Sequence, residues 1–276
     1  MNTTFIGGGN MATALIGSLI ARGGAAAAFR VVEPSPEARN RVVEAFPGLV
    51  LFERSCRDAV AGAAVVVLAV KPQQMRAAAR ALAADLGAAG EPVVLTIAAG
   101  IRIADLSRWL GGYPRVVRAM PNTPALIGRG ISGVFAAPAV DAAGRANALA
   151  ILEAAGGVLW VDAEARLDAI TAVSGSGPAY VFYFLEALEE AARAQGFGPA
   201  DARRLAYATF AGALALAERS AQEPAVLRAQ VTSKGGTTEA ALAAMQAAGV
   251  KPAIVAGVDA AATRARELGD VFGRDA

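Results

Sequence analysis

From residue 1 to residue 161 the chain alternates short, β-branched apolar runs with longer stretches of helical periodicity. The runs at 65–70 and 93–97 are apolar throughout, which is typical of parallel strands covered on both faces. The pattern predicts strands at 3–6, 29–33, 49–52, 65–70, 93–97, 115–120, 131–136 and 157–161. It predicts intervening helices at 11–22, 36–46, 73–86, 103–110 and 142–155. This alternation predicts a doubly wound α/β sheet with right-handed crossovers.

Beyond residue 162 the β-branched runs disappear and apolar residues recur at helical spacing. The pattern predicts helices at 164–173, 178–195, 199–220, 224–231, 237–248 and 252–268. Four of them begin near a proline, a position where the missing N–H costs nothing. We therefore predict two domains, an α/β domain at 1–161 and an all-helical domain at 162–276.

The segment 205–216 is apolar on nearly every face of the predicted helix. Such a helix must be buried all round, and a small helical domain has little interior to hold it. The pattern favours a partner subunit that packs the same helices across a two-fold axis. The alternative is burial of this helix within its own chain.

Composition excludes several classes of protein. The chain has no histidine and one cysteine, Cys56, which argues against a metal site and internal disulfides and favours a reducing compartment. The net charge of +2 comes without a basic stripe, so we expect no nucleic-acid partner. Charges or glycines interrupt the apolar runs, and the first predicted strand begins near the N-terminus. We expect no membrane span, no signal peptide and a cytoplasmic location.

A glycine-rich loop follows the first predicted strand and precedes the first helix, reading Gly7-Gly8-Gly9-Asn10-Met11-Ala12. In this Rossmann-like pattern, Gly7 would make the tight turn and Gly9 would let the backbone approach a pyrophosphate. Ala12 would permit close packing of helix on strand. The context of strand, loop and helix predicts a dinucleotide site.

Residues after the second strand bear on the kind of dinucleotide. Glu33 could bind a ribose 2′-hydroxyl and repel a 2′-phosphate, as in NAD-binding proteins. Ser35 and Arg39 could instead hold a 2′-phosphate, as in NADP-binding proteins. The sequence leaves both alternatives open, as well as a plain surface loop.

The ends of later strands supply further candidates, because the carboxyl ends of parallel strands line the ligand crevice of such sheets. These residues are Ala69, Val70, Lys71 and Pro72 after one strand, Ala98, Ala99 and Gly100 after the next, and Asn122 after the last. Lys71 could equally be a solvated loop residue, and Asn122 a simple turn residue between prolines.

Two segments of the helical part crowd hydroxyl residues and glycines against a helix start. They read Ser174-Gly-Ser-Gly-Pro-Ala-Tyr180 and Val231-Thr-Ser-Lys-Gly-Gly-Thr-Thr238. Free N–H groups and the positive end of the helix dipole suit a small carboxylate there. A dinucleotide loop with such sites indicates an enzyme that acts on a small anionic substrate.

Taken in order, these motifs resemble the pyrroline-5-carboxylate reductase family along nearly the whole chain. The resemblance implies a Rossmann domain and a helical dimerisation domain, with a homodimer or a larger ring of dimers. It implies reduction of L-1-pyrroline-5-carboxylate to L-proline with NADPH, or alternatively NADH. It implies that Ser233, Gly236, Thr237 and Thr238 bind the substrate. The glycine loop, Ser35 and the strand-end residues named above would bind the cofactor.

The chain departs from the family pattern at two positions. Lys234 stands where the family usually has a proline, which loosens the substrate loop. Cys56 stands where many members have an asparagine near the adenosine ribose.

The chemistry deduced from the residues agrees with the resemblance. Backbone N–H groups at 236–238 would bind the carboxylate of a cyclic imine, and the Thr238 hydroxyl would orient the ring nitrogen. An iminium arrives already protonated, so a chain without histidine can carry out the reaction. Simple helix capping is the alternative role for Thr237 and Thr238.

Two other functions remain as alternatives. A β-hydroxyacid dehydrogenase would need a lysine and an asparagine on the first helix of the second domain, and 178–192 has neither. A non-catalytic NADP-sensing protein would have no need of a second anion site.

Overall fold

The computed structural model describes residues 1–274, which form two compact units. The first unit comprises Met1–Ser176 together with the C-terminal residues from Ala261 onward, and the second comprises Gly177–Ala260. The predicted domains, 1–161 and 162–276, differ from these units at both ends of the helical part. Residues 162–176 and the end of the last helix belong to the first unit.

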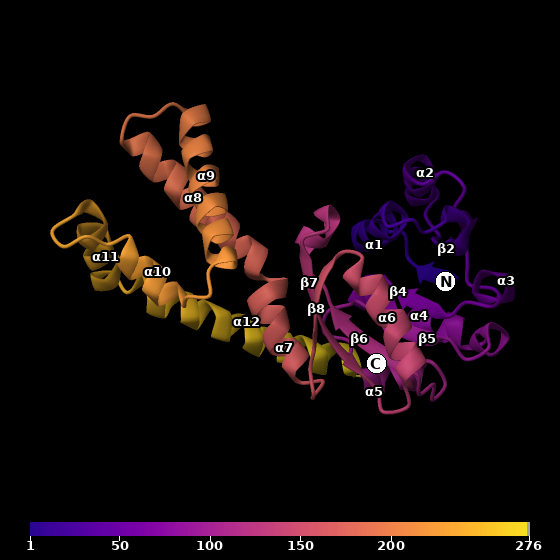
Figure 1. Cartoon of the computed structure of the whole chain (residues 1–276). Helices are drawn as coiled ribbons and strands as arrows, with labels where there is room; N and C mark the ends of the chain where they lie inside the picture. Colours follow the sequence, from indigo (N-terminus) through magenta and orange to yellow (C-terminus); the bar gives the residue numbers. More distant parts are fainter. Residues whose placement is uncertain (275–276) are drawn as a thin grey trace. The chain divides into compact units, whose positions relative to one another are not determined.

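The first unit is built on an eight-stranded sheet of order β3-β2-β1-β4-β5-β6-β7-β8 (Figure 1). The strands are β1 (Thr3–Ile6), β2 (Phe29–Val32), β3 (Val50–Phe52), β4 (Val65–Leu68), β5 (Val93–Thr96), β6 (Val116–Met120), β7 (Gly130–Ala136) and β8 (Gly156–Trp160). All neighbouring pairs are parallel except β6 and β7. The strand order reverses between β1 and β4, the place where doubly wound sheets bind ligands.

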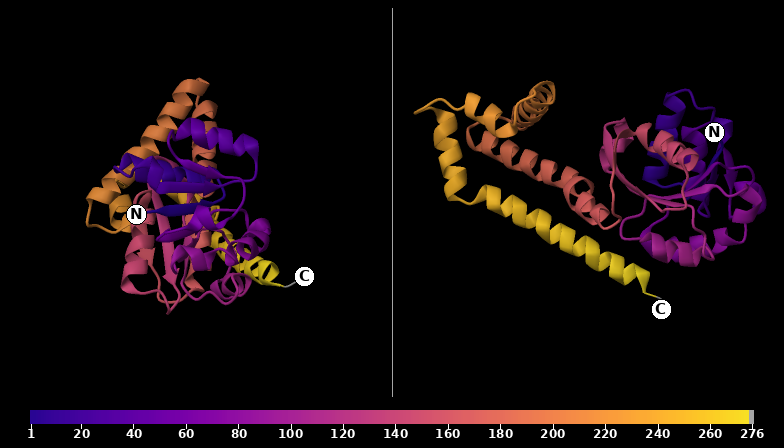
Figure 2. Two further views of the ribbon diagram at one scale, coloured as in Figure 1. Left: turned by 90° about the vertical axis from the view of Figure 1, so that its right-hand side faces the viewer. Right: turned by 60° about the horizontal axis from the view of Figure 1, so that its bottom comes forward.

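Helices cover both faces of this sheet (Figure 2). They are α1 (Asn10–Ala21), α2 (Pro36–Ala45), α3 (Arg57–Val60), α4 (Pro72–Ala83), α5 (Ile103–Trp109), α6 (Ala142–Glu153) and α7 (Arg166–Ile170), with short helical turns η1 (Ala26–Ala28), η2 (Leu86–Ala89) and η3 (Thr123–Ile127). Strand side chains alternate between the faces: Phe5 packs with α1, α2 and α6, whereas Ile6 packs with α3, α4 and α5. This two-sided burial explains the uninterrupted apolar runs and confirms the doubly wound fold.

A buried arginine joins β6 to α7. Arg118 is 3% exposed and pairs with Glu164 at 3.0 Å and with Asp168 at 3.3 Å. The same Glu164 oxygen accepts the N–H of Ile103 at the start of α5. The segment predicted as one helix at 164–173 is α7 followed by a π-helical turn, η4 (Thr171–Gly175).

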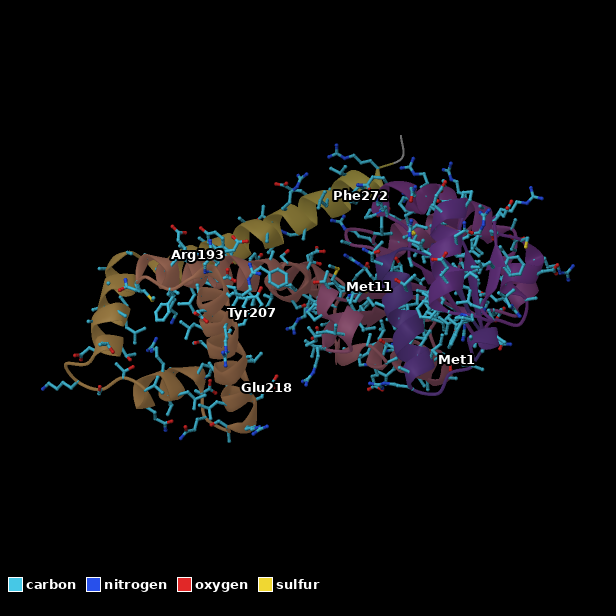
Figure 3. The ribbon with its side chains drawn as sticks, turned by 90° about the horizontal axis from the view of Figure 1, so that it is seen from above. Met1, Met11, Arg193, Tyr207, Glu218 and Phe272 are labelled. Atoms are coloured by element: carbon cyan, nitrogen blue, oxygen red, sulfur yellow. The ribbon has the colours of Figure 1, made fainter. Side chains whose placement is uncertain are left out.

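The second unit consists of α8 (Gly177–Ala194), α9 (Pro199–Arg219), α10 (Pro224–Gln230), α11 (Thr237–Ala247) and the first part of α12 (Val250–Gly273). Its apolar side chains remain largely exposed in the single chain. Leu214 and Leu216 of α9 are 62% and 59% exposed, and Tyr207, labelled in Figure 3, is 52% exposed. The second unit by itself therefore does not bury the apolar helix predicted at 205–216.

The last turns of α12 belong to the first unit. Phe272 lies against Gly100, and Arg102 pairs with Asp270 at 2.7 Å. Helix α12 thus extends past its predicted end at residue 268, because its final residues have partners on the loop before α5.

Candidate active site

The glycine loop has the geometry that a pyrophosphate requires. Gly7 has φ +103°, and a Cβ there would lie 2.9 Å from the carbonyl oxygen of Ala69. Gly9 is the N-cap of α1, with no side-chain cap and with open space where a Cβ would stand. The first intrahelical bond to Gly9 comes from Thr13, so the N–H groups of residues 10–12 face outward from the helix start. This uncapped 12-residue helix fits a dinucleotide phosphate.

The side chains predicted around this loop occupy different positions. Ala12 is fully buried and packs in the core, as a close helix–strand contact requires. Asn10 is exposed at the start of α1, and Met11 is half-buried against the core.

A cavity of about 570 Å³ lies beside the glycine loop, at the carboxyl ends of β1 and β2. It is where the adenosine half of a dinucleotide would lie. Its lining residues are Ile6, Gly7, Val32, Glu33, Pro34, Ser35, Glu53, Arg54, Ser55, Val70, Gln74, Ala77, Ala78 and Ala81.

Two predicted residues form one wall of this cavity. The Glu33 carboxylate accepts the N–H groups of Gly8 and Ser35, each at 2.9 Å. Ser35 is the N-cap of α2: its hydroxyl accepts from the Ala38 N–H at 3.2 Å and donates to Glu37 at 2.7 Å. That donated hydrogen bond is the main cause that lowers the pKa of Glu37 from its ordinary value. Cys56 packs half-buried against the core, and its neighbour Ser55 lines the cavity instead.

The residues predicted for the nicotinamide half follow β4 and β5. Ala69 and Val70 are half-buried, Lys71 is the exposed N-cap of α4, and Pro72 is its first residue. Ala98 is 6% exposed and Ala99 is half-buried, so the side chains that follow β5 at this end of the sheet are small. Gly100 is buried with φ +72°, and a Cβ there would lie 3.0 Å from the Phe272 ring.

Both polar atoms of the Asn122 amide make a hydrogen bond within the first unit. Its oxygen accepts the N–H of Ile131 at 2.9 Å, and its nitrogen donates to the carbonyl of Ser174 at 3.1 Å. The side chain thus ties the end of β6 to β7 and to η4. Asn122 and Arg118 both hold elements of the first unit together. The sequence did not predict this role for Arg118, and its position inside an apolar strand was the one feature that could have indicated it.

The residues predicted to bind substrate gather before α11, in the second unit. Gly235 has φ +75°, and its N–H donates to Glu239. The Gly236 N–H donates to the carbonyl of Ser233 at 3.0 Å. In this structure the loop itself uses the N–H that Gly236 is predicted to donate to a substrate carboxylate. A Cβ at 236 would meet the Ser233 hydroxyl, so a larger residue there would require the Ser233 side chain to move.

Thr237 and Thr238 are the first two residues of α11, and Gly236 is its N-cap without a side-chain cap. Neither threonine hydroxyl donates to a group in the part of the chain that the structure describes, and their N–H groups lie in the first turn, where helices leave donors free. Capping is therefore not the role of these side chains. Lys234 is exposed in the loop.

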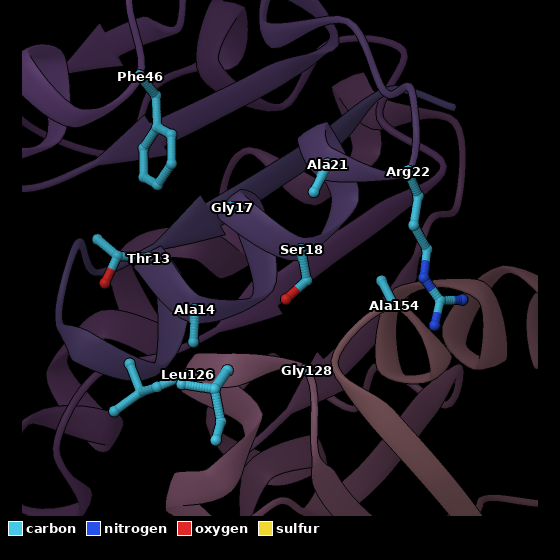
Figure 4. A pocket seen from close by; sticks show the side chains of 11 residues that line it. Thr13, Ala14, Gly17, Ser18, Ala21, Arg22, Phe46, Leu126, Gly128 and Ala154 are labelled. Carbon is cyan, nitrogen blue, oxygen red and sulfur yellow. The ribbon is translucent and has the colours of Figure 1, made fainter.

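Three further observations bear on function. A cavity of about 610 Å³ runs along α1, with Leu126 and Ile127 at its edge, and contains none of the predicted site residues (Figure 4). Over residues 1–274, no group of three or more histidine, cysteine or carboxylate side chains is arranged to hold a metal ion. In the same range no single helix meets the length and hydropathy of a membrane span, although α11 and α12 do so together as a bent pair.

Comparison with known proteins decides the family. A pyrroline-5-carboxylate reductase of Pseudomonas aeruginosa is 46% identical over 98% of this chain and 97% of its own length. The chain belongs to the pyrroline-5-carboxylate reductase family. Residues 164–268 match the model described as pyrroline-5-carboxylate reductase dimerisation. Residues 2–100 match the one described as NADP oxidoreductase, coenzyme F420-dependent.

Solved structures agree with this assignment. A pyrroline-5-carboxylate reductase from Coxiella burnetii superposes with a TM-score of 0.89 at 38% identity, covering 97% of this chain and 98% of its own. The pyrroline carboxylate reductase of Plasmodium falciparum, solved with NADP bound, shares the fold with a TM-score of 0.85 at 24% identity and 98% coverage of both chains. The chain is an NAD(P)-dependent oxidoreductase with a Rossmann-like domain and a helical dimerisation domain, as the sequence predicted.

Proposed function

We propose that this chain reduces the C=N bond of L-1-pyrroline-5-carboxylate with NAD(P)H to give L-proline, the last step of proline biosynthesis. The observation that carries the proposal is the Ser233–Thr238 loop, which presents free donors at the start of α11. It occurs in a chain that belongs to a family of such reductases along nearly its full length.

Thr237 and Thr238 would hold the substrate carboxylate through their backbone N–H groups. Both lie in the first turn of an 11-residue helix, where free N–H groups and the helix dipole favour an anion. Glu239, in the same turn, is already hydrogen-bonded to the Gly235 N–H. That bond fixes the loop backbone around the binding donors.

The Thr238 hydroxyl would orient the ring nitrogen through a hydrogen bond. It is half-buried and has no hydrogen-bond partner in residues 1–274, so it is free to serve a ligand. When bound, the reduced nicotinamide supplies a hydride to the imine carbon. The nitrogen keeps the proton that the iminium already carries and becomes the amine of proline, so no side chain has to donate one.

The assembly follows from the second unit, and we propose a homodimer formed by its helices. An apolar groove of about 440 Å³ lies between α8 and α12, lined by Tyr180, Tyr183, Phe184 and Ile254 among others. With the exposed leucines of α9 it forms a surface that a second copy of the dimerisation domain would cover. A cytoplasmic location accords with the single cysteine.

The test is a spectrophotometric assay of NADH and NADPH oxidation by the purified protein, with and without pyrroline-5-carboxylate. We expect oxidation only when the imine is present. Turnover of a 3-hydroxy acid without turnover of the imine would overturn the proposal. Binding of cofactor and proline without any turnover would indicate a sensing protein instead.

A further inference from the structure

At the adenosine end of the cofactor cavity, two backbone hydrogen bonds hold one carboxylate, that of Glu33, in place. Glu33 directly follows β2, and its two oxygens accept N–H groups from Gly8, in the phosphate loop, and from Ser35, at the start of α2. Both bonds are 2.9 Å long. Two backbone donors therefore hold the carboxylate at the point where the adenosine ribose of a bound dinucleotide would lie.

The carboxylate keeps acceptor capacity for a ligand. An ionised carboxylate has about four lone-pair sites, and the two backbone bonds use about half of them. The remaining sites suit donors such as the 2′- and 3′-hydroxyls of a ribose. A 2′-phosphate instead carries a charge of roughly −1.5 to −2 near neutral pH and offers no comparable donors.

The nearby Arg39 does not offset the negative charge of the Glu33 carboxylate. Arg39 donates to the carbonyls of Glu33 and Pro34 at 2.9 and 2.8 Å, and it pairs with Glu53 at 2.8 Å. Its side chain is only 17% exposed. The guanidinium thus holds the loop in place and is neutralised by Glu53, and it does not line the cavity.

The hydroxyls of the wall are also unsuited to a phosphate. Ser35 donates its proton to Glu37, and Ser55 donates to Asp85 at 2.8 Å. Among the residues that line this cavity, Arg54 is the one cation, against two acids, Glu33 and Glu53.

We infer that Glu33 makes this site select NADH over NADPH. This preference is the alternative to the NADPH expected from the family resemblance, and it rests on the proposed function only where it concerns turnover. Repulsion between a fixed carboxylate and a phosphate a few ångströms away predicts a preference on the order of tenfold or more.

The decisive test is calorimetric titration of the purified full-length protein with ADP-ribose and with 2′-phospho-ADP-ribose. These fragments probe the adenosine site without the nicotinamide or the imine. We expect the unphosphorylated fragment to bind on the order of tenfold more tightly. Equal affinities, or tighter binding of the phosphorylated fragment, would overturn the inference.

Three variants refine the test. Glu33→Gln keeps the side-chain size but removes the charge, and should shrink the difference in affinity to a few-fold or less. Glu53→Gln, at a 78% exposed side chain, removes the second acid of the cavity lining and the ion pair of Arg39, and should raise the affinity for the phosphorylated fragment a few-fold. Glu44→Gln, an exposed acid of α2 outside the cavity, is the matched control and should leave the ratio unchanged. An unchanged ratio in both Glu33→Gln and Glu53→Gln would assign the selectivity elsewhere.

Steady-state kinetics with both nucleotides distinguish the cofactor preference from the proposed function. With pyrroline-5-carboxylate as substrate, kcat/KM should be higher with NADH than with NADPH, and Glu33→Gln should reduce that ratio. If neither nucleotide supports turnover while the binding preference holds, the proposed function fails and the assignment of Glu33 stands.

Discussion

Glu164 accepts a charged hydrogen bond from Arg118 at 3.0 Å, across 46 residues of sequence. The same oxygen accepts the N–H of Ile103, so one carboxylate joins β6, α5 and the segment before α7. This arrangement fixes the start of α5, which follows the loop predicted to face the nicotinamide. It also explains why residues 162–176 pack with the sheet.

Replacement of Arg118 by methionine should lower the free energy of unfolding by about 3 kcal/mol, because it leaves two carboxylates facing an apolar side chain. Glu164 and Asp168 keep 25% and 14% of their side chains exposed, which limits the cost. Urea denaturation at fixed protein concentration measures the change. Arg166→Ala, which removes an exposed pair with Asp162, is the control and should cost under about 1 kcal/mol. Equal effects of the two variants would contradict a structural role for the buried cluster.

Gly100→Ala should destabilise the protein for two reasons. The residue has φ +72°, and the new Cβ would lie 3.0 Å from the Phe272 ring. Gly196 has φ +92° with open space around it, so Gly196→Ala carries only the backbone penalty of about 1 kcal/mol. Thermal melting should show a larger loss for Gly100→Ala. The difference should shrink in the background of Phe272→Ala, and a constant difference would show that the ring does not matter.

Thr238→Ala should lower kcat/KM for the imine roughly tenfold while leaving the melting temperature nearly unchanged. The loss corresponds to one neutral hydrogen bond, worth about 0.5–1.5 kcal/mol. Thr232→Ala removes a hydroxyl that donates to the Arg228 carbonyl in the same segment, and it should lower activity less. A lower melting temperature with unchanged activity would show that the Thr238 side chain contributes only to stability. A thousandfold loss would indicate proton transfer.

Leu214→Glu should shift the protein from dimer to monomer or to insoluble material. The leucine is 62% exposed in the single chain and lies on the apolar helix α9. Sedimentation equilibrium measures the mass. Val43→Glu, a 47% exposed apolar residue of α2 in the other unit, is the control and should leave the mass unchanged. A monomeric wild-type protein with full activity on dilution would contradict the proposed assembly.

Stability should fall at high pH because of Tyr113. Burial raises the pKa of its hydroxyl from 10.0 to about 12, and the hydroxyl donates to the carbonyl of Pro92 at 2.6 Å. The unfolded chain therefore loses this proton first, so the contribution is complete below pH 10 and disappears as the pH rises toward 12. Urea midpoints measured from pH 9 to 11 should fall less in Tyr113→Phe than in the wild type. Identical slopes would show that Tyr113 is not involved.

Local patterns were sufficient to predict much of this molecule. Strand and helix positions followed from apolar periodicity, since burial on both faces leaves a continuous apolar run such as 65–70. The glycine loop followed from Gly7 and Gly9 in their place between a strand and a helix, although the close approach of Gly7 to Ala69 depends on the fold.

Features that depend on distant partners could not be predicted. The pairing of Arg118 with Glu164 and the contact of Phe272 with Gly100 join residues far apart in the chain. The same limit applies to Asn122, because its residue type suggested a turn or a ligand and did not indicate that its amide joins two elements of the first unit. The use of the Gly236 N–H inside its own loop also depends on backbone geometry that no residue type reveals.

The most direct test of the proposed reductase activity is the rate of NADH and NADPH oxidation by the purified protein, measured with pyrroline-5-carboxylate, with a 3-hydroxy acid and with neither. We expect oxidation with the imine alone, formation of L-proline in equal amount, and a higher kcat/KM with NADH. Absence of proline formation with both nucleotides, in a protein that binds them, would contradict it.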